Sequence, residues 1–204
     1  MAKGKMKTVR EKEASLIPYY DGKLEYYSPA AETELTRIMN KVVAPVEGSM
    51  LDVGCGDGRA SLYSKKHGMD YVGADYSQAR VSKARSVYGQ TVDGRRPVIF
   101  MCTNIYDLLP AIAAESYELI WCCELLEHLE QPTVIWEAMQ RLCRGMVVCT
   151  CPVNMPYASH LQVFKNDEQL HATFPGITNL HHMRFPTGHG KKREHFIFTY
   201  EYNK

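Results

Sequence analysis

The chain has 204 residues, of which 45% are hydrophobic and 23% are charged, and its formal net charge at pH 7 is +1. This composition predicts a globular protein of one domain that is long enough to bury a core. The near-zero charge excludes a strong overall attraction to nucleic acid or an anionic membrane, and no apolar run reaches the ~20 residues that span a bilayer.

The N-terminal residues carry no secretory signal, because residues 1–10 are basic and lack an apolar stretch. The seven cysteines do not show the Cys-x-x-Cys spacing of a zinc site. We therefore expect buried free thiols in a cytoplasmic protein. Residues 1–13 are polar and lysine-rich, which predicts a flexible tail. Four tyrosines follow among turn residues, and apolar side chains recur at helical spacing over residues 30–43.

From residue 50 onward, apolar strand patterns alternate with helical patterns. Strands are predicted at residues 50–53, 71–74, 97–102, 117–122 and 146–151. Helices are predicted over residues 59–67 before Gly68, from the N-cap Ser77 to about residue 87, and from Pro132 to a stop at Gly145. This alternation predicts an α/β fold, a doubly wound parallel sheet with helices on both faces.

The C-terminal part has a different pattern. A helix is predicted at residues 166–174, and two β-rich stretches follow at 180–185 and 195–202. The polar residues 188–193 between them are predicted to form a hairpin loop. The run Lys191, Lys192 and Arg193 within it could contact phosphates, although a solvated loop tip is the simpler interpretation.

The most informative stretch is residues 51–58, which read Leu-Asp-Val-Gly-Cys-Gly-Asp-Gly. Glycines let the backbone turn sharply and approach a ligand, and the loop feeds a helix whose first N–H groups are available. Ligands of open α/β sheets lie beyond the carboxyl ends of the strands. There we expect Asp75 to accept the hydroxyls of a ribose, Asn104 and Ile105 to meet an adenine, and Glu124 to follow the fourth strand.

Two nucleotide-like cofactors compete for this loop. A dinucleotide requires Gly-x-Gly-x-x-Gly and places its pyrophosphate on the helix N-terminus, whereas this chain has Gly-x-Gly-x-Gly. Asp52 and Asp57 would repel a pyrophosphate and suit a cation. S-adenosylmethionine carries a sulfonium and an ammonium group and no phosphate, so the acidic loop favours it.

Three motifs carry a resemblance to a known family. Residues 51–59 resemble motif I of the class I S-adenosylmethionine-dependent methyltransferases, and residues 73–77 resemble the acidic motif that follows it. Residues 124–129, Glu-Leu-Leu-Glu-His-Leu, resemble the post-strand-four motif of the branch that includes ubiquinone-pathway O-methyltransferases. The resemblance runs over residues 50–152. It implies a Rossmann-like, mostly parallel sheet of seven strands that a C-terminal antiparallel pair completes.

The resemblance also implies a cofactor, S-adenosylmethionine, with S-adenosylhomocysteine as its product. In this family the glycine loop holds the methionine part, Asp75 holds the ribose and Asn104 lies near the adenine, where the family often has Asp. The cofactor-binding residues implied are Asp52, Gly54, Cys55, Gly56, Gly58, Asp75, Tyr76, Asn104, Ile105 and Glu124.

The domain organisation that follows is a single methyltransferase domain over residues 1–204. It consists of the tail at 1–13, an N-terminal helical lid segment at 14–45 and a catalytic core at 50–204. The tyrosines Tyr19, Tyr20, Tyr26 and Tyr27 lie where this branch commonly has a lid over the cofactor. Packing of the N-terminal segment is their alternative role.

Methyl transfer from a sulfonium is an in-line displacement that depends on alignment, and a hydroxyl nucleophile must also lose its proton. His128 is a candidate base near the exit of the fourth strand, although it could also only shape the site. Glu124 and His160, which follows the fifth strand, complete the candidate catalytic residues.

A metal ion is the alternative use of these side chains. Glu124, Glu127 and His128, with His160 as a fourth ligand, could hold a divalent ion. Small-RNA 3′-terminal 2′-O-methyltransferases use a Glu-x-x-Glu-His cluster and a distant histidine in this way. Because small-molecule methyltransferases share the same sequence motif, we expect no bound metal ion.

The function predicted is that of a cytoplasmic methyltransferase acting on an oxygen or nitrogen of a small-molecule acceptor, with no membrane partner. The first alternative is an RNA 2′-O-methyltransferase that uses the Glu/Glu/His metal cluster, for which salt-dependent RNA binding would speak. The second is a protein that binds the cofactor without catalysis. The identity of the acceptor and the oligomeric state are left open.

Overall fold

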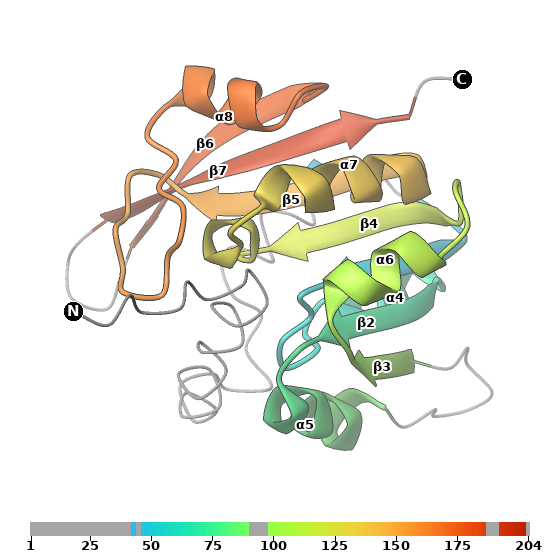
Figure 1. The fold of residues 1–204 in the computed structure, drawn as a ribbon. Helices are drawn as coiled ribbons and strands as arrows, with labels where there is room; N and C mark the ends of the chain where they lie inside the picture. Colours follow the sequence, from blue (N-terminus) through green and yellow to red (C-terminus); the bar gives the residue numbers. More distant parts are fainter. Residues whose placement is uncertain (1–41, 44–45, 90–97, 187–191, 203–204) are drawn as a thin grey trace, which may run out of the picture.

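A computed structural model describes residues 42–43, 46–89, 98–186 and 192–202. They form one seven-stranded sheet in the order β3-β2-β1-β4-β5-β7-β6 (Figure 1). The strands are β1 (Ser49–Val53), β2 (Asp70–Asp75), β3 (Val98–Cys102), β4 (Tyr117–Cys123), β5 (Cys143–Pro152), β6 (Asn179–Pro186) and β7 (Lys192–Glu201). β1 to β5 run parallel, and β7 pairs antiparallel with both β5 and β6.

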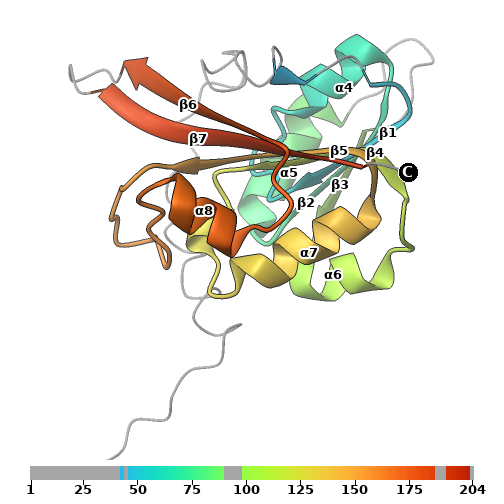
Figure 2. The same ribbon diagram turned by 90° about the horizontal axis from the view of Figure 1, so that it is seen from above.

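Helices cover both faces of this sheet, as Figure 2 shows. The helices α4 (Ser61–His67) and α5 (Gln78–Tyr88) lie on one face. On the other face lie α6 (Ile105–Ala111), α7 (Pro132–Leu142) and α8 (Asp167–Thr173). The predicted doubly wound sheet with a C-terminal antiparallel pair is therefore confirmed.

Alternating side chains of the buried strands pack into two hydrophobic cores, one on each face of the sheet. On β4, Leu119 and Trp121 pack on the side of α4 and α5, while Ile120 and Cys122 pack with α6, α7 and α8. All four are at most 2% exposed. Strands buried on both faces must be apolar at successive positions, which explains why the sequence shows short continuous apolar runs here.

One end each of α4 and α5 follows the predicted signal. Gly68 closes α4 in the left-handed conformation with φ 66°. Ser77 caps α5, and its side chain accepts a hydrogen bond from Arg80 N at 3.2 Å. Asn166, which was not predicted as a cap, caps α8 in the same way through Gln169 N, at 2.9 Å. None of the helices in the described part of the chain has the length and apolar character that crossing a membrane requires.

Three details differ from the sequence prediction. The helix α6 was not predicted, and it begins directly after Asn104. α7 ends at Leu142, and β5 begins at once at Cys143, so that Gly145 lies inside a strand instead of ending a helix. Gly145 passes close to the backbone of Glu118, where a side chain would clash. Lys192 and Arg193 belong to β7, so the connection is shorter than predicted.

The cysteines are free thiols throughout the described chain. Five of them are buried as expected and Cys123 is half-buried, but Cys102 at the end of the edge strand β3 is exposed. The expected tail at 1–13 lies outside the described residues. The four tyrosines also lie outside them. Of the expected lid segment and the expected helix over 30–43, only Val42 and Val43 are described.

Candidate functional site

The glycine loop leaves β1 at the carboxyl edge of the sheet. Gly54, Gly56 and Gly58 have φ values of 76°, 52° and 85°, which residues with a side chain rarely adopt. At Gly58 a Cβ would also lie 2.7 Å from the ring of Phe100. The N–H groups of Gly54 and Cys55 donate to Ala74 O at 2.8 and 3.0 Å. The loop is therefore fixed against the end of β2.

Asp75 is the last residue of β2, and its carboxylate is hydrogen-bonded to this loop. Its Oδ2 accepts a hydrogen bond from Gly56 N at 2.9 Å, and its Oδ1 accepts one from Ser77 N at 2.8 Å. Burial raises the pKa of this carboxyl, and the backbone N–H donors partly offset that effect. Because a carboxylate accepts about four hydrogen bonds, both oxygens keep the capacity to bind hydroxyl groups of a ligand.

The other two aspartates of the loop already have partners. Asp52 is 3% exposed and accepts a hydrogen bond from Tyr71 Oη at 2.6 Å. Burial raises the pKa of Asp52 to about 7, against the lowering effect of Tyr71. Asp57 pairs with Arg59 Nε at 3.3 Å and Lys83 Nζ at 3.9 Å. The negative charge that was expected to repel a pyrophosphate is thus partly compensated within the protein.

The residues expected near the nucleoside lie at the ends of β2 and β3. Asn104 caps α6, and its Oδ1 accepts a hydrogen bond from Tyr106 N at 2.9 Å. Ile105 behind it is 7% exposed, whereas Tyr76 is 43% exposed. Asn104 therefore has a structural role that the sequence prediction missed, and its contact with an adenine stays a prediction.

Glu124 follows β4 in a left-handed conformation with φ 51°. Its N–H donates to Thr150 O at 3.1 Å, and its Oε1 accepts a hydrogen bond from Thr150 Oγ1 at 3.0 Å. Its Oε2 lies 3.2 Å from His195 Nε2. Unstrained residues with a side chain rarely hold such a φ, and strain of this kind concentrates at functional sites.

His195 and Thr150 are partners of Glu124 that sequence reasoning missed. His195 is a residue of β7 that pairs with Pro152 at the end of β5. The antiparallel register thus brings it to the carboxyl edge of the parallel strands. Nothing in the local pattern around residue 195 marks it, because the signal lies in the pairing of strands far apart in the chain.

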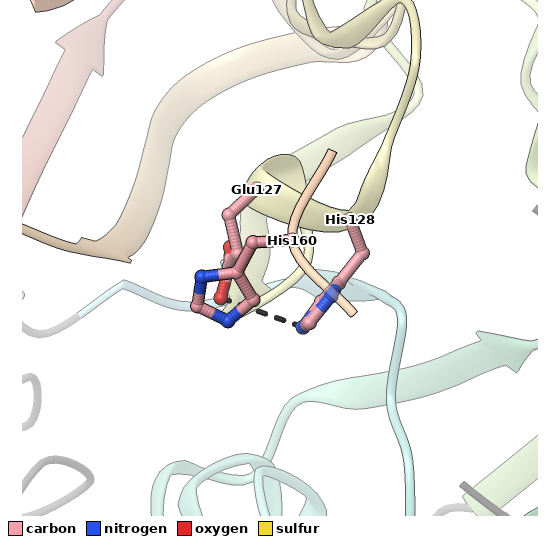
Figure 3. Close-up of side chains that lie close together, drawn as sticks. All are labelled: Glu127, His128 and His160. Carbon is pink, nitrogen blue, oxygen red and sulfur yellow. Dashed lines mark ion pairs between the residues drawn. The ribbon is translucent and has the colours of Figure 1, made fainter. Parts of the chain in front are cut away.

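Glu127, His128 and His160 converge beside this edge (Figure 3). Glu127 and His128 come from the 3₁₀ turn η2 (Leu126–His128), and His160 comes from the loop after β5. One donor atom of each residue lies within 4.8 Å of the others, and His128 Nε2 is 3.6 Å from Glu127 Oε1. Burial lowers the pKa of His128 to about 4 and that of His160 as well, whereas it raises the pKa of Glu127.

Of the expected metal-ligand candidates, Glu127 and His128 lie together with His160, while Glu124 lies near this cluster and has other hydrogen-bond partners. Glu124 precedes the turn η2, and its left-handed backbone directs the carboxylate to Thr150 and His195. His160 lies beside Glu127 and His128. Such a set of two imidazoles and one carboxylate could hold a divalent metal ion.

Comparisons with known proteins agree with this architecture. Residues 51–149 match the protein family described as a methyltransferase domain. The ubiquinone biosynthesis O-methyltransferase of Hahella chejuensis is 37% identical over 98 residues, which are 47% of this chain and 38% of that protein. The enzyme of the same name from Cereibacter sphaeroides is 30% identical over 134 residues, which are 63% of this chain and 51% of that protein. The chain thus spans about half or less of these curated relatives.

Solved structures share the fold at lower sequence identity. The 1,6-didemethyltoxoflavin-N1-methyltransferase of Burkholderia thailandensis, with bound 1,6-didemethyltoxoflavin and S-adenosylhomocysteine, superposes with a TM-score of 0.69 at 17% identity. That comparison covers all of this chain and 94% of the other. The magnesium protoporphyrin IX methyltransferase of Synechocystis, with bound S-adenosylmethionine, has a TM-score of 0.64 at 12% identity and covers 97% of this chain and 99% of the other.

Proposed function

We propose that this chain is a class I S-adenosylmethionine-dependent methyltransferase that transfers the methyl group of S-adenosylmethionine to an oxygen of a small-molecule acceptor. Oxygen is favoured over nitrogen because the curated relatives are named O-methyltransferases. The acceptor hydroxyl loses its proton, its oxygen bonds to the methyl carbon, and the carbon–sulfur bond breaks to give S-adenosylhomocysteine.

The observation that carries the cofactor assignment is the contact between Asp75 and the glycine loop. A single carboxylate fixes Gly56 N and Ser77 N and keeps acceptor capacity on both oxygens. In our proposal these oxygens accept the ribose hydroxyls. The glycine loop with Asp52, Gly54, Cys55, Gly56 and Gly58 then lies along the methionine part, and Tyr76, Asn104 and Ile105 lie along the nucleoside.

Glu124, His128 and His160 form the acceptor side in this proposal. Glu124 directly follows β4, and its neighbour Leu125 is the residue that a Cβ on Gly54 would meet, at 2.9 Å. The side chain of Glu124 is 36% exposed, more than that of His128 at 14%. We therefore assign the acceptor's proton to Glu124. An aligned displacement of this kind needs little beyond orientation and a proton acceptor.

The first experiment measures cofactor binding by titration calorimetry with S-adenosylhomocysteine. Asp75→Ala should weaken binding by ~1–3 kcal/mol, which is about 5-fold to 150-fold, because the ribose hydroxyls lose a charged acceptor. Asp70→Asn, at the exposed start of the same strand, is the matched control. Equal affinities for Asp75→Ala and the wild type would refute the assignment.

The second experiment measures turnover as S-adenosylhomocysteine release with a panel of phenols, catechols, aliphatic alcohols and amines. Product formed only with the hydroxyl compounds is the expected result. Product formed only with amines would contradict the oxygen assignment. Tight cofactor binding without product from any compound, an RNA oligonucleotide included, would instead favour a binding protein without catalysis.

A further inference from the structure

We infer that Glu127, His128 and His160 form a binding site for one divalent transition metal ion. The three donor atoms lie within 4.8 Å of one another, and the pair His128 Nε2 and Glu127 Oε1 is already at 3.6 Å. Ligands of a tetrahedral zinc ion, at about 2.1 Å from the metal, are separated from each other by about 3.4 Å. Small rotations of these side chains therefore suffice to place an ion between them (Figure 3).

The hydrogen bonds of the two imidazoles fix the tautomer that a metal requires. Nδ1 of His128 lies 2.8 Å from Ser159 O, and Nδ1 of His160 lies 2.7 Å from Met155 O. A carbonyl oxygen only accepts hydrogen bonds, so each Nδ1 carries the proton and donates it. On each ring it is then Nε2 that carries the lone pair which binds a metal. Metal-binding histidines almost always donate their other ring N–H to a carbonyl or carboxylate in this manner.

The carboxylate of Glu127 gives an independent indication of a missing ligand. Glu127 is 1% exposed, and within the described ranges no hydrogen-bond donor reaches its Oε2. A buried carboxylate oxygen without a donor is unfavourable, and buried charges are normally paired or bound to metals. A cation at the three donor atoms would satisfy it.

The backbone around the cluster is fixed before any ion binds. The N–H groups of Leu161 and Gln162, which follow His160, both donate to the carbonyl of Glu127, at 2.8 and 2.9 Å. The side chain of Gln162 donates to the carbonyls of Leu129 and Glu130, at 3.1 and 3.2 Å. The loop after β5 is thus fastened to the turn η2. Such support keeps the donors in place and favours binding.

The donor set selects the class of metal. Two imidazoles and one carboxylate suit Zn²⁺, Fe²⁺ or Mn²⁺, whereas Mg²⁺ and Ca²⁺ prefer oxygen ligands. Three protein ligands also leave positions open for a ligand from solution. Glu124 is outside the set because Thr150 and His195 hold its carboxylate. We assign the open coordination positions of the metal to the acceptor's hydroxyl oxygen, whose proton then passes to Glu124. This assignment rests on the proposed function.

The experiment uses the full chain without a histidine tag, freed of metal by chelation and dialysis. Zn²⁺ is titrated by calorimetry, and Co²⁺ is added as a spectroscopic probe of imidazole ligation. We expect one equivalent to bind, with thermal stabilisation of the protein. His160→Asn and Glu127→Gln should weaken binding at least 10-fold. His181→Asn, an exposed histidine outside the cluster, should leave the affinity unchanged. Glu124→Gln removes a nearby negative charge and should weaken binding less than Glu127→Gln does.

Thermal unfolding without metal checks that each variant is folded. If Glu127→Gln does not fold, His160→Asn alone is the test variant. Absence of binding to the folded wild type, or equal affinity in wild type and His160→Asn, would overturn the inference. A loss in Glu124→Gln as large as that in Glu127→Gln would also overturn the three-residue set. Binding of S-adenosylhomocysteine is measured on the same metal-free samples, so that a failure of the metal site is separate from a failure of the proposed function.

Discussion

Asp52→Asn should change how the stability of this protein depends on pH. The carboxyl of Asp52 is buried in β1, and its pKa is raised from 3.8 to about 7. A group whose pKa is higher in the folded state favours folding while it is protonated. That contribution is complete below pH 3.8 and is lost as the pH rises through about 7.

The size of the effect follows from this pKa. One pKa unit is equivalent to about 1.4 kcal/mol, so the full loss is about 4 kcal/mol. Roughly 2–3 kcal/mol of it falls between pH 5 and pH 8, because the unfolded carboxyl is already ionised at pH 5. The asparagine does not titrate, and its amide oxygen still accepts the hydrogen bond from Tyr71. The variant should therefore gain roughly 2–3 kcal/mol on the wild type over this interval.

Urea unfolding followed by tryptophan fluorescence, without cofactor, at pH 5, 6, 7 and 8 gives the two stability curves. Tyr71→Phe is the companion variant, since it removes the hydroxyl that lowers the pKa of Asp52. It should move the loss of stability to higher pH. Parallel curves for the wild type and Asp52→Asn would refute the reasoning.

Substitutions at four further positions test the local structure by thermal or urea unfolding. Gly68→Ala should cost about 1–2 kcal/mol from its left-handed backbone alone, because no atom lies within 4 Å of the added Cβ. Gly58→Ala should cost more, since its Cβ would also meet Phe100 at 2.7 Å; equal losses for the two glycines would contradict this. Asn104→Ala should lose the helix cap, at about 0.5–2 kcal/mol, whereas Asn104→Asp should keep it; equal losses for the two variants would argue against capping. Trp136→Phe should cost about 1–3 kcal/mol, because the fully buried indole N–H donates to a backbone carbonyl at 2.8 Å; an unchanged urea midpoint would disprove that.

The parallel sheet and its glycine loop were predictable from the sequence because their signals are local. The apolar runs, the cap at Ser77 and the stop at Gly68 each depend on a few neighbouring residues. The placement of Asp75 beside the loop follows from the same topology, since parallel strands end at one edge.

The helix α6 and the acceptor side were harder to predict. α6 contains Pro110 and spans only seven residues, too few to show a clear helical period. The position of Glu124 depends on a left-handed backbone conformation. Glycine is the residue that usually adopts this conformation, so a glutamate at this position does not predict it. His160 was a candidate because it follows the fifth strand, whereas His195 reaches Glu124 through a strand pairing over a long separation, which no local pattern encodes.

The strand order also sets the sequence in which the two halves of the site can form. The loop, Asp75 and Asn104 lie within the first 105 residues, at the ends of β1, β2 and β3, of which β2 pairs with both of the others. Glu124 acquires His195 only when β7 joins β5, a pairing that links Met146 to Glu201. Contacts of such long range form late and slowly in folding. During synthesis, the glycine loop with Asp75 and Asn104 can therefore assemble before Glu124 meets His195, and β5 stays an open edge until the antiparallel pair arrives.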